Sequence, residues 1–269
     1  MPLTSITSGI GMELLPDVYC FPVQIVNVCF IGFPGRKEFV LVDAGMPDSE
    51  KLLMKGIKKR FGADAVLKAI ILTHGHFDHV GALEAILEKW NVPVYAHKLE
   101  EPYLTGQTDY PPANPDVPGL VAKMSPRFPR HSIDISGQLQ ILPEDGSIPC
   151  LPDWKYIHTP GHTPGHISLY REQDEVLIAG DAFVTVEQES LYEVITQKQE
   201  IHGPPAYFTM DWLQASSSVK KLAALKPKVA ITGHGLPMTD TELVENLTIL
   251  AEQFEETEIP ENRKYENRH

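Results

Sequence analysis

The chain contains the segment Thr73-His74-Gly75-His76-Phe77-Asp78-His79-Val80-Gly81, directly after the apolar run Ala69-Ile70-Ile71-Leu72. Three imidazoles and one carboxylate therefore fall within six positions, at what we interpret as the end of a buried strand. Imidazole combined with carboxylate suits zinc, and also iron, manganese or cobalt, whereas calcium and magnesium sites are built from oxygen ligands. The segment predicts a transition-metal site.

The spacing of these side chains has a geometric reason. His74 and His76 are two positions apart, so they project to the same side of an extended chain that leaves a strand. The glycine between them permits a tight turn. Asp78 and His79 follow where the chain would enter a helix over residues 81–90, so one short loop can serve two adjacent metal ions. The alternative is an exposed polar turn that carries three histidines and no metal.

Three later segments repeat the arrangement of an apolar strand, a glycine and a ligand-type residue. They end in Gly161-His162, Gly180-Asp181 and Gly233-His234. Together with the first segment, this pattern of HxHxDH followed by His, Asp and His resembles that of the metallo-β-lactamase-fold hydrolase superfamily, over nearly the whole chain. The resemblance implies an α/β fold, the four-layer αββα sandwich, with the metals at one edge between the ends of the two sheets.

The resemblance also implies how the ligands divide between two divalent metal ions. One ion would take His74, His76 and His162, the other would take Asp78, His79 and His234, and Asp181 would bridge them. Asp43 also ends a strand, and the resemblance implies that it orients a ligand, since metal-bound histidine usually donates its other ring N–H to a carboxylate or carbonyl. We expect His166 to form a hydrogen bond with a backbone group rather than to bind metal. Zinc is the expected metal, with iron and manganese as alternatives.

Composition and charge restrict the remaining possibilities. The length fits a single domain over residues 1–269, and 42% hydrophobic residues are ordinary for a packed core. No window offers the ~18 uninterrupted apolar residues of a spanning helix, so we expect a cytoplasmic protein without a membrane partner. A net charge of -13 disfavours nucleic acid as a partner. Cys20, Cys29 and Cys150 are an odd number at wide spacing, which argues against disulfides.

Strand and helix patterns alternate along the chain. Strands are predicted for residues 18–21, 26–31, 39–42, 69–72, 93–96, 139–142, 154–158, 167–170, 175–179 and 229–231. Helices are predicted for residues 49–61, 81–90 and 210–225, the last with Thr209 as N-cap, and a capping box at residues 239–242 predicts a final helix to about Phe254. The polar chain from Glu258 onward is expected to fray.

The stretch from residue 101 to about residue 130 is rich in proline, which predicts a surface excursion without strands or a long helix. Long loops of this kind are often functional lids, and we predict that Tyr110 and Phe128 on this one contact substrate. A packed insert without ligand contact and a subunit contact in a homodimer are the alternatives. His202, in a turn-rich stretch between the predicted bridging carboxylate and the last ligand, is a third candidate for substrate contact.

The ligand set predicts a mechanism. Two cations that share one water lower its pKa toward neutrality, and the resulting hydroxide attacks the carbonyl carbon of a small-molecule substrate. Asp181 and Asp78 are the expected catalytic carboxylates, the first as the bridge and the second as a ligand that also relays a proton to the leaving group. Resemblance to the lactonase and glyoxalase II branches implies ester, thioester or lactone hydrolysis. Acyl-homoserine lactone is not favoured, because Val184 stands where the lactonases for that substrate carry tyrosine.

Other functions of the same fold remain open. A persulfide dioxygenase would hold a single iron with fewer of these ligands, and a β-lactamase or phosphodiesterase would use the metals on a different bond. A catalytically silent binding module is a further alternative, but such a scaffold has no need of clustered cations whose binding must offset the desolvation of their ligands. Two equivalents of zinc would indicate a hydrolase, and one of iron would indicate the dioxygenase.

Overall fold

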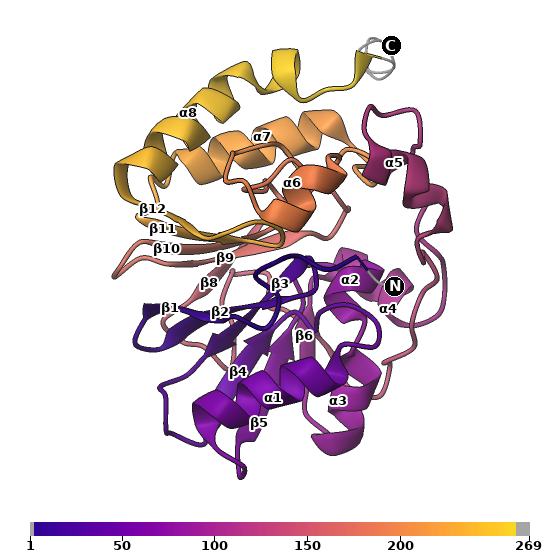
Figure 1. The fold of residues 1–269 in the computed structure, drawn as a ribbon. Helices are drawn as coiled ribbons and strands as arrows, with labels where there is room; N and C mark the ends of the chain where they lie inside the picture. Colours follow the sequence, from indigo (N-terminus) through magenta and orange to yellow (C-terminus); the bar gives the residue numbers. More distant parts are fainter. Residues whose placement is uncertain (1–2, 262–269) are drawn as a thin grey trace.

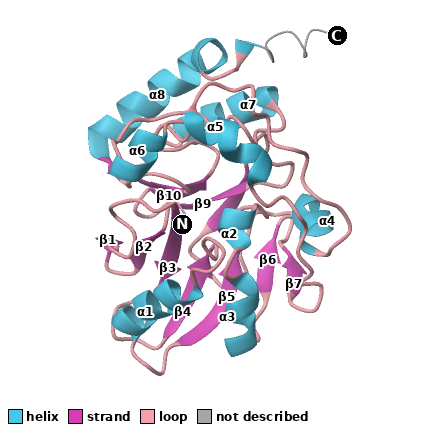
Figure 2. Cartoon of the chain, turned by 45° about the vertical axis from the view of Figure 1, so that its right-hand side comes forward, coloured by secondary structure: helices cyan, strands magenta, loops and turns pink. Residues whose placement is uncertain are grey.

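The computed structural model describes residues 3–261, and two β-sheets stacked face to face form its centre (Figure 1). Helices cover the outer face of each sheet, so the layers follow one another as helix, sheet, sheet and helix (Figure 2). The predicted α/β class and αββα sandwich are therefore confirmed. In Figure 1 the first sheet and its helices form the lower half of the molecule, and the second sheet and its helices form the upper half.

The first sheet has seven strands in sequence order. They are β1 (Met12–Leu15), β2 (Val18–Val23), β3 (Val26–Ile31), β4 (Glu38–Val42), β5 (Val66–Ile71), β6 (Val94–Ala96) and β7 (Leu139–Ile141). Strands β1 to β4 are antiparallel, and β4 to β7 run parallel. Helices α1 (Glu50–Phe61) and α3 (Leu83–Lys89) cover the outer face, and the short α2 (Phe77–Val80) follows β5.

The second sheet has the order β12-β11-β10-β9-β8. Its strands are β8 (Lys155–His158), β9 (Ile167–Arg171), β10 (Val176–Gly180), β11 (Val229–Thr232) and β12 (Met238–Thr239). Helices α7 (Trp212–Ala223) and α8 (Asp240–Thr257) pack side by side on its outer face, and α6 (Leu191–Thr196) lies between β10 and α7 in the chain.

The inner strands are apolar on both sides because each sheet is covered on both faces. In β4, Leu41 points into the core beneath α1, whereas Val40 and Val42 point into the core between the sheets. In β10, Ile178 faces the core between the sheets and Leu177 faces the core beneath α7 and α8. The two-residue period of each strand thus distributes its side chains over three layers of core.

The helix predicted over residues 81–90 is observed as α3, which begins at Leu83, and the separate short helix α2 precedes it. The backbone N–H of Gly81 donates to the carbonyl of Gly45 at 2.7 Å, in the loop after β4, rather than to the preceding helical turn. That loop is so close that a Cβ at position 81 would lie 2.1 Å from the nitrogen of Pro47. The loss of the intrahelical bond interrupts the helix at this glycine.

The starts of the last two helices differ from the prediction. Helix α7 is capped by Asp211, which accepts from the N–H of Gln214 at 2.9 Å, and not by Thr209. Helix α8 starts after Thr239 as predicted, but no capping box forms, because the threonine hydroxyl pairs with the carboxylate of Asp240. The residue types located the starts of both helices correctly, but contacts in the folded chain decided which neighbouring polar side chain acts as the N-cap.

The chain after α8 does not fray at once, contrary to the prediction. The carboxylate of Glu258 accepts from the N–H of Gly203 at 2.7 Å, and Ile259 is buried. The rest of the predicted tail, residues 262–269, lies outside the described residues. Strands β1 and β12 and helix α6 were not predicted, because they are short and largely half-exposed and so carry a weak apolar pattern.

The proline-rich excursion contains short helices only, as predicted. Its elements are α4 (Glu101–Leu104), α5 (Leu120–Met124) and the 3-10 turn η2 (Ser125–Arg127), and the 3-10 turn η1 (Lys98–Glu100) precedes them. In Figure 1 the excursion runs from α4 beside the lower half to α5 beside the upper half. There Val117, Val121 and Ala122 pack against Tyr207 in a small core of their own.

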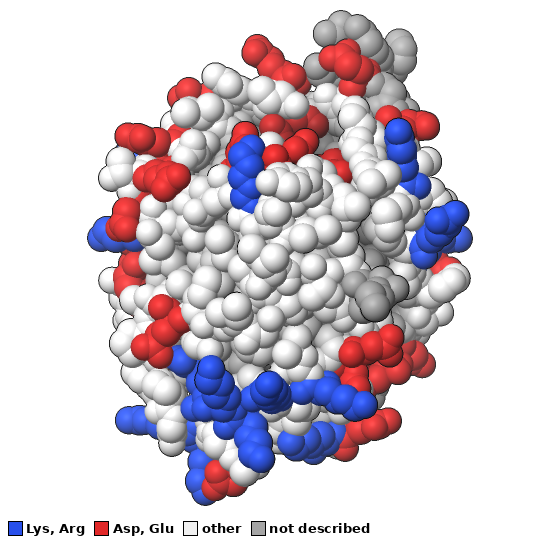
Figure 3. Space-filling model, viewed as in Figure 1, with Lys and Arg blue, Asp and Glu red and all other residues white. Residues whose placement is uncertain are grey.

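Charged side chains are unevenly distributed over the face that Figure 3 shows. Figure 3 shows Lys and Arg gathered at the lower end, over α1, and Asp and Glu gathered around a hollow near the top. Helix α1 presents exposed lysines at Lys51, Lys55, Lys58 and Lys59. Among residues 3–261, no helix is long and apolar enough to cross a membrane. The three cysteines are free, as predicted.

Candidate metal centre

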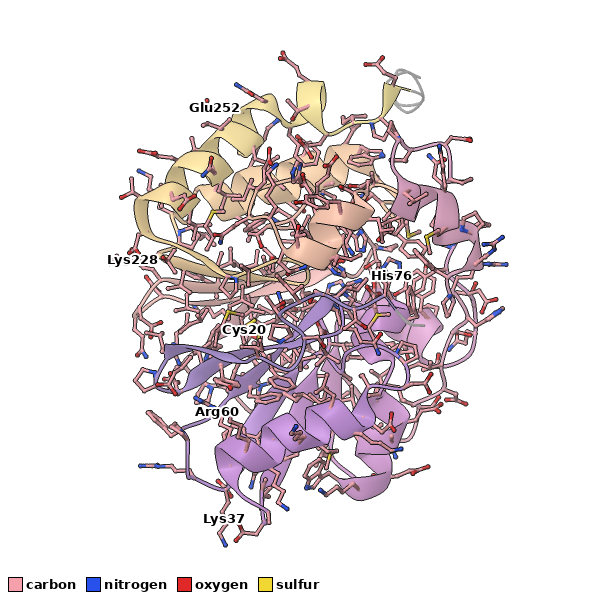
Figure 4. All side chains as sticks on the ribbon, viewed as in Figure 1. Cys20, Lys37, Arg60, His76, Lys228 and Glu252 are labelled. Atoms are coloured by element: carbon pink, nitrogen blue, oxygen red, sulfur yellow. The ribbon has the colours of Figure 1, made fainter. Side chains whose placement is uncertain are left out.

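Seven polar side chains meet at one edge of the sandwich, where strands of both sheets end. They are His74 and His76 after β5, Asp78 and His79 on α2, His162 after β8, Asp181 after β10 and His234 after β11. Each is at most 8% exposed. Figure 4 shows His76 at the junction between the lower and upper halves. Ionisable side chains are this deeply buried only when they are paired or can coordinate a metal.

Three imidazoles form the first group. His76 Nδ1 lies 3.0 Å from His74 Nε2 and 2.9 Å from His162 Nε2. Burial lowers the pKa of His74 and of His162 well below its ordinary value, and that of His76 to about 4. The neutral ring is the form that binds metal. Because one proton on His76 Nδ1 can serve only one of the two facing nitrogens, this group fits a cation better than a hydrogen-bond network.

The second group consists of Asp78, His79 and His234, and Asp181 lies between the groups. Asp78 Oδ2 is 3.3 Å from His234 Nε2 and 3.9 Å from His79 Nε2. Asp181 Oδ2 is 3.3 Å from His234 Nε2 and 3.5 Å from His162 Nε2. One carboxylate oxygen therefore approaches a nitrogen of each group, which is the geometry that a bridging ligand needs.

Two atoms of the cluster are buried without a hydrogen-bond partner, His79 Nε2 and Asp181 Oδ1, which lie 3.5 Å apart. A Cβ at position 233 would lie 1.9 Å from Asp181 Oδ1, so only glycine at this position leaves room for the carboxylate. An unsatisfied buried polar atom costs roughly 1–3 kcal/mol, and a cation placed between these atoms would satisfy both. The residues present therefore fit two metal ions.

The charge distribution differs between the two groups. Burial by itself would lower the pKa of His234, but the carboxylates of Asp181 and Asp78 raise it to about 10. The same balance holds the pKa of His79 well above its ordinary value. Burial would raise the pKa of Asp181, yet His234 and His79 hold it well below the usual range. The carboxylates thus attract positive charge to the second group, and a divalent cation would displace these protons.

Asp43 makes the contact that the sequence predicts. Its Oδ2 accepts from His79 Nδ1 at 2.8 Å, and the carboxylate also accepts from the N–H and the hydroxyl of Thr73, each at 2.8 Å. The residue has a left-handed backbone, with φ of 62°. These contacts fix Nδ1 of His79 as the donor, so its Nε2 faces the cluster with the lone pair available.

Glu100, a fully buried carboxylate beside the cluster, was not predicted from the sequence. One oxygen accepts from the N–H of Gly75 at 2.9 Å and from the hydroxyl of Tyr110, and the other accepts from the N–H of Gly165 at 2.8 Å and from the hydroxyl of Thr163 at 2.7 Å. Burial raises the pKa of this carboxyl although all four donors favour its charged form. Glu100 therefore joins the two loops that carry the three imidazoles of the first group.

Two further residues orient candidate ligands from behind. His166 Nε2 accepts from the backbone N–H of Asp181 at 2.9 Å, so this histidine satisfies a backbone group as predicted. The hydroxyl of Thr209 lies 3.3 Å from His162 Nδ1 and donates to a backbone carbonyl on its other side. Each contact leaves the opposite end of the ligand directed into the cluster.

The structure brings two of the three predicted substrate residues near the cluster. The Tyr110 ring lies 4.4 Å from the His76 ring between centroids, but it is buried and its hydroxyl is bound inside the protein, which favours a supporting role over the predicted contact with substrate. Phe128 lies in an aromatic group, 5.8 Å from Phe77 and 6.3 Å from Phe208 between ring centroids. Phe208 in turn lies 4.8 Å from His76. Phe128 is thus one ring removed from the candidate ligands.

His202 lies apart from the cluster. It borders a space of about 910 Å³ that several acidic residues line and whose lining includes none of the seven candidate ligands. Its backbone pairs with that of Val184 in both directions, at 2.9 and 3.0 Å. The predicted contact of His202 with a substrate at the metal centre therefore receives no support from this arrangement.

A family model described as the metallo-beta-lactamase superfamily matches residues 22–234, a range that holds all seven candidate ligands. The chain belongs to the metallo-beta-lactamase superfamily. The match covers the four ligand segments and the strands β3 to β11, so membership agrees with the αββα architecture and with the His and Asp cluster at its edge.

The chain is similar to individual members of the superfamily in sequence and in structure. The chain is 59% identical over 256 residues to the probable metallo-hydrolase YflN of Bacillus subtilis, which covers 94% of this chain and 97% of that protein. It is 27% identical over 153 residues to the hydroxyacylglutathione hydrolase GloC of Haemophilus influenzae, with 57% of this chain and 65% of that protein covered. The solved structure of TTHA1623 in a di-iron-bound form matches with a TM-score of 0.56 and 25% identity, over 88% of this chain and 97% of that one.

Proposed function

We propose that this protein is a metal-dependent hydrolase with two divalent ions in the cluster. His74, His76 and His162 would hold one ion, Asp78, His79 and His234 would hold the other, and Asp181 would bridge them. The position of Asp181 Oδ2, within 3.5 Å of a nitrogen of each group, is the observation on which the dinuclear proposal rests. The high identity to a probable metallo-hydrolase supports the hydrolase class.

When bound, the two ions supply a water of lowered pKa and an electrophilic partner for the substrate oxygen. The protein contributes position and charge. Asp43 holds the ring of His79, and His166 holds the backbone of Asp181, so neither ligand reorganises during the reaction. Asp78 is the most exposed of the seven, at 8%, which supports the proposal that its carboxylate passes a proton to the leaving group.

For the substrate we propose an ester, thioester or lactone. The relative named as a hydroxyacylglutathione hydrolase supports a thioester or ester bond. The rings of Phe77, Phe128 and Phe208 next to His76 would provide apolar contact area for the acyl group. Zinc is the proposed metal because it suits a mixed imidazole and carboxylate set. The di-iron form of a structural neighbour makes iron the alternative to measure.

The test combines metal analysis with a substrate panel. His74→Ala should lower the metal content and abolish turnover while the fold is retained, because one of three ligands of the first ion is removed. His131→Ala is the matched control, since His131 is exposed and pairs only with Asp109 on the surface. Purified protein is assayed on lactones, thioesters, phosphodiesters and β-lactams. No more than one ion per metal-replete chain would overturn the dinuclear proposal, and a single iron with persulfide oxidation would favour the dioxygenase.

A further inference from the structure

A second group of metal-ligating side chains lies away from the metal centre, between α6 and the strand-like segment that follows it. Glu193 comes from α6, and Glu200 and His202 come from that segment. One ligand atom from each of the three lies within 4.8 Å of the others. None of the three touches the seven residues of the main cluster in the hydrogen bonds and ion pairs of residues 3–261.

Two atoms of this group are buried without a hydrogen-bond partner, Glu193 Oε2 and His202 Nε2. A shielded carboxylate oxygen and a shielded ring nitrogen normally find partners, because each unsatisfied atom costs free energy. The chain geometry explains why Glu200 and His202 lie on the same side of their segment. Glu200 and His202 are two positions apart on an extended segment, so both side chains leave the same face, and backbone pairing with Val184 and Thr185 fixes that face.

We infer that Glu193, Glu200 and His202 form a second, separate site for one divalent cation of the zinc or manganese class. Two carboxylates and one imidazole match the ligand preferences of these metals, and three protein ligands leave positions for water. The inference does not depend on the proposed hydrolase activity, because it concerns different residues.

The ammonium group of Lys198 would compete with a metal ion for the carboxylates of this site. Its ammonium lies 3.2 Å from Glu193 Oε1 and 2.8 Å from Glu200 Oε2. The lysine side chain is 55% exposed, so it can turn into solvent, and exposed ion pairs of this kind contribute little to stability. Glu193 Oε2 stays free of the lysine, so this oxygen and His202 Nε2 are the atoms that a cation would gain.

A bound cation would restrict the motion of the chain segment next to the metal centre. Val184 exchanges two backbone hydrogen bonds with His202, and the N–H of the next residue, Thr185, donates to the carbonyl of His234 at 3.2 Å. Val184 also lies three residues after Asp181. A cation that joins α6 to His202 would therefore restrict a strand that leads directly to two candidate ligands.

The experiment is a Zn²⁺ titration, by calorimetry, of full-length protein whose main centre is already saturated with zinc. Wild type should take up one further equivalent. His202→Gln and Glu193→Gln should each weaken that uptake at least tenfold, since the loss of outer-shell partners alone costs 10–100-fold in metal affinity. Glu187→Gln is the control, because Glu187 lines the neighbouring hollow but is not among the three ligands. Lys198→Met should bind at least as tightly as wild type.

Metal retained at the main centre shows that each variant is folded, and it separates failure of this inference from failure of the proposed function. The inference is overturned if wild type takes up no further equivalent, if both His202→Gln and Glu193→Gln keep it unchanged, or if Lys198→Met binds zinc more weakly than wild type.

Discussion

Glu100→Gln removes one of the two oxygens that hold the ligand loops together. Whichever way the amide turns, its NH₂ group faces one backbone N–H, either that of Gly75 or that of Gly165. The hydroxyls of Tyr110 and Thr163 can rotate and accept from the amide, but a backbone N–H cannot. With the NH₂ group toward Gly165, that N–H loses its acceptor; with it toward Gly75, the N–H keeps the Tyr110 hydroxyl at 3.0 Å, but the Tyr110 O–H loses the oxygen that it donates to. In either orientation one buried donor is left without an acceptor, at a cost of roughly 1–3 kcal/mol.

Part of this cost is offset. Burial raises the pKa of the Glu100 carboxyl, which means that burying the ionised carboxylate costs free energy. A neutral amide avoids this cost. We expect a net loss of about 1–2 kcal/mol in the free energy of unfolding for Glu100→Gln. Glu100→Ala removes the acceptor of all four donors, of which the N–H of Gly75 alone keeps a second one in the Tyr110 hydroxyl, and should cost about 2–5 kcal/mol.

The functional effect should exceed the effect on stability. Gly75 separates His74 from His76, and Gly165 lies three residues after His162. When Glu100 no longer holds both glycine N–H groups, all three imidazoles of the first group can therefore shift from their positions. Loss of such outer-shell support typically lowers metal affinity 10–100-fold. Chelator competition measures the affinity, and urea unfolding of chelator-treated protein measures the stability.

Glu101→Gln is the matched control, because Glu101 is the next residue, has the same side chain and is exposed. It should leave both quantities at the wild-type level. If Glu100→Gln matches this control in metal affinity and in unfolding, the carboxylate does not brace the ligand loops and the reasoning is wrong.

Three further predictions concern other parts of the molecule. Asp181→Asn keeps the shape but removes the bridging charge, so elemental analysis should find a fall from two ions to one per chain, and unchanged content would contradict the bridge. Phe128→Ala should raise KM severalfold or shift acyl preference at constant metal content, whereas wild-type kinetics would exclude the ring from the substrate path. Burial, followed by the His158 ring stacked 4.1 Å away, lowers the pKa of His97 from 6.5 to about 4. The stabilising contribution of the neutral His97 ring is complete above pH 6.5 and is lost as the pH falls toward 4. The free energy of unfolding should therefore differ between pH 7 and pH 4 by about 1 kcal/mol less in His97→Gln than in wild type, a value reduced for solvent screening. An unchanged difference would refute this prediction.

The metal cluster could be predicted from the sequence because each candidate ligand is marked locally. An apolar strand, a glycine and a polar residue recur at His162, Asp181 and His234, and strands that end at the same edge bring such residues together. The same local signal identified Asp43 after β4. The αββα fold followed from the resemblance that these segments carry, rather than from the strand pattern alone.

Glu100 could not be predicted in this way, because its partners are distant in sequence. It lies 25 residues from Gly75 and 65 from Gly165, on a short turn whose neighbours are polar. The available signal was indirect. Both glycine N–H groups belong to buried ligand loops and must find acceptors somewhere, but only the folded chain shows which carboxylate supplies them.

Two of the local predictions that failed lie next to the metal centre, and the reason is physical. Thr209 is as good an N-cap as Asp211 by residue type, but its hydroxyl is used 3.3 Å from His162, so the cap moves two residues onward. The helix predicted over residues 81–90 begins only at Leu83, because the N–H of Gly81, two positions after His79, bonds to the loop behind Asp43. In both places a group that would have completed a regular helix is used instead to position a candidate ligand. At these two places the geometry of the cluster is under stronger constraint than the helices beside it.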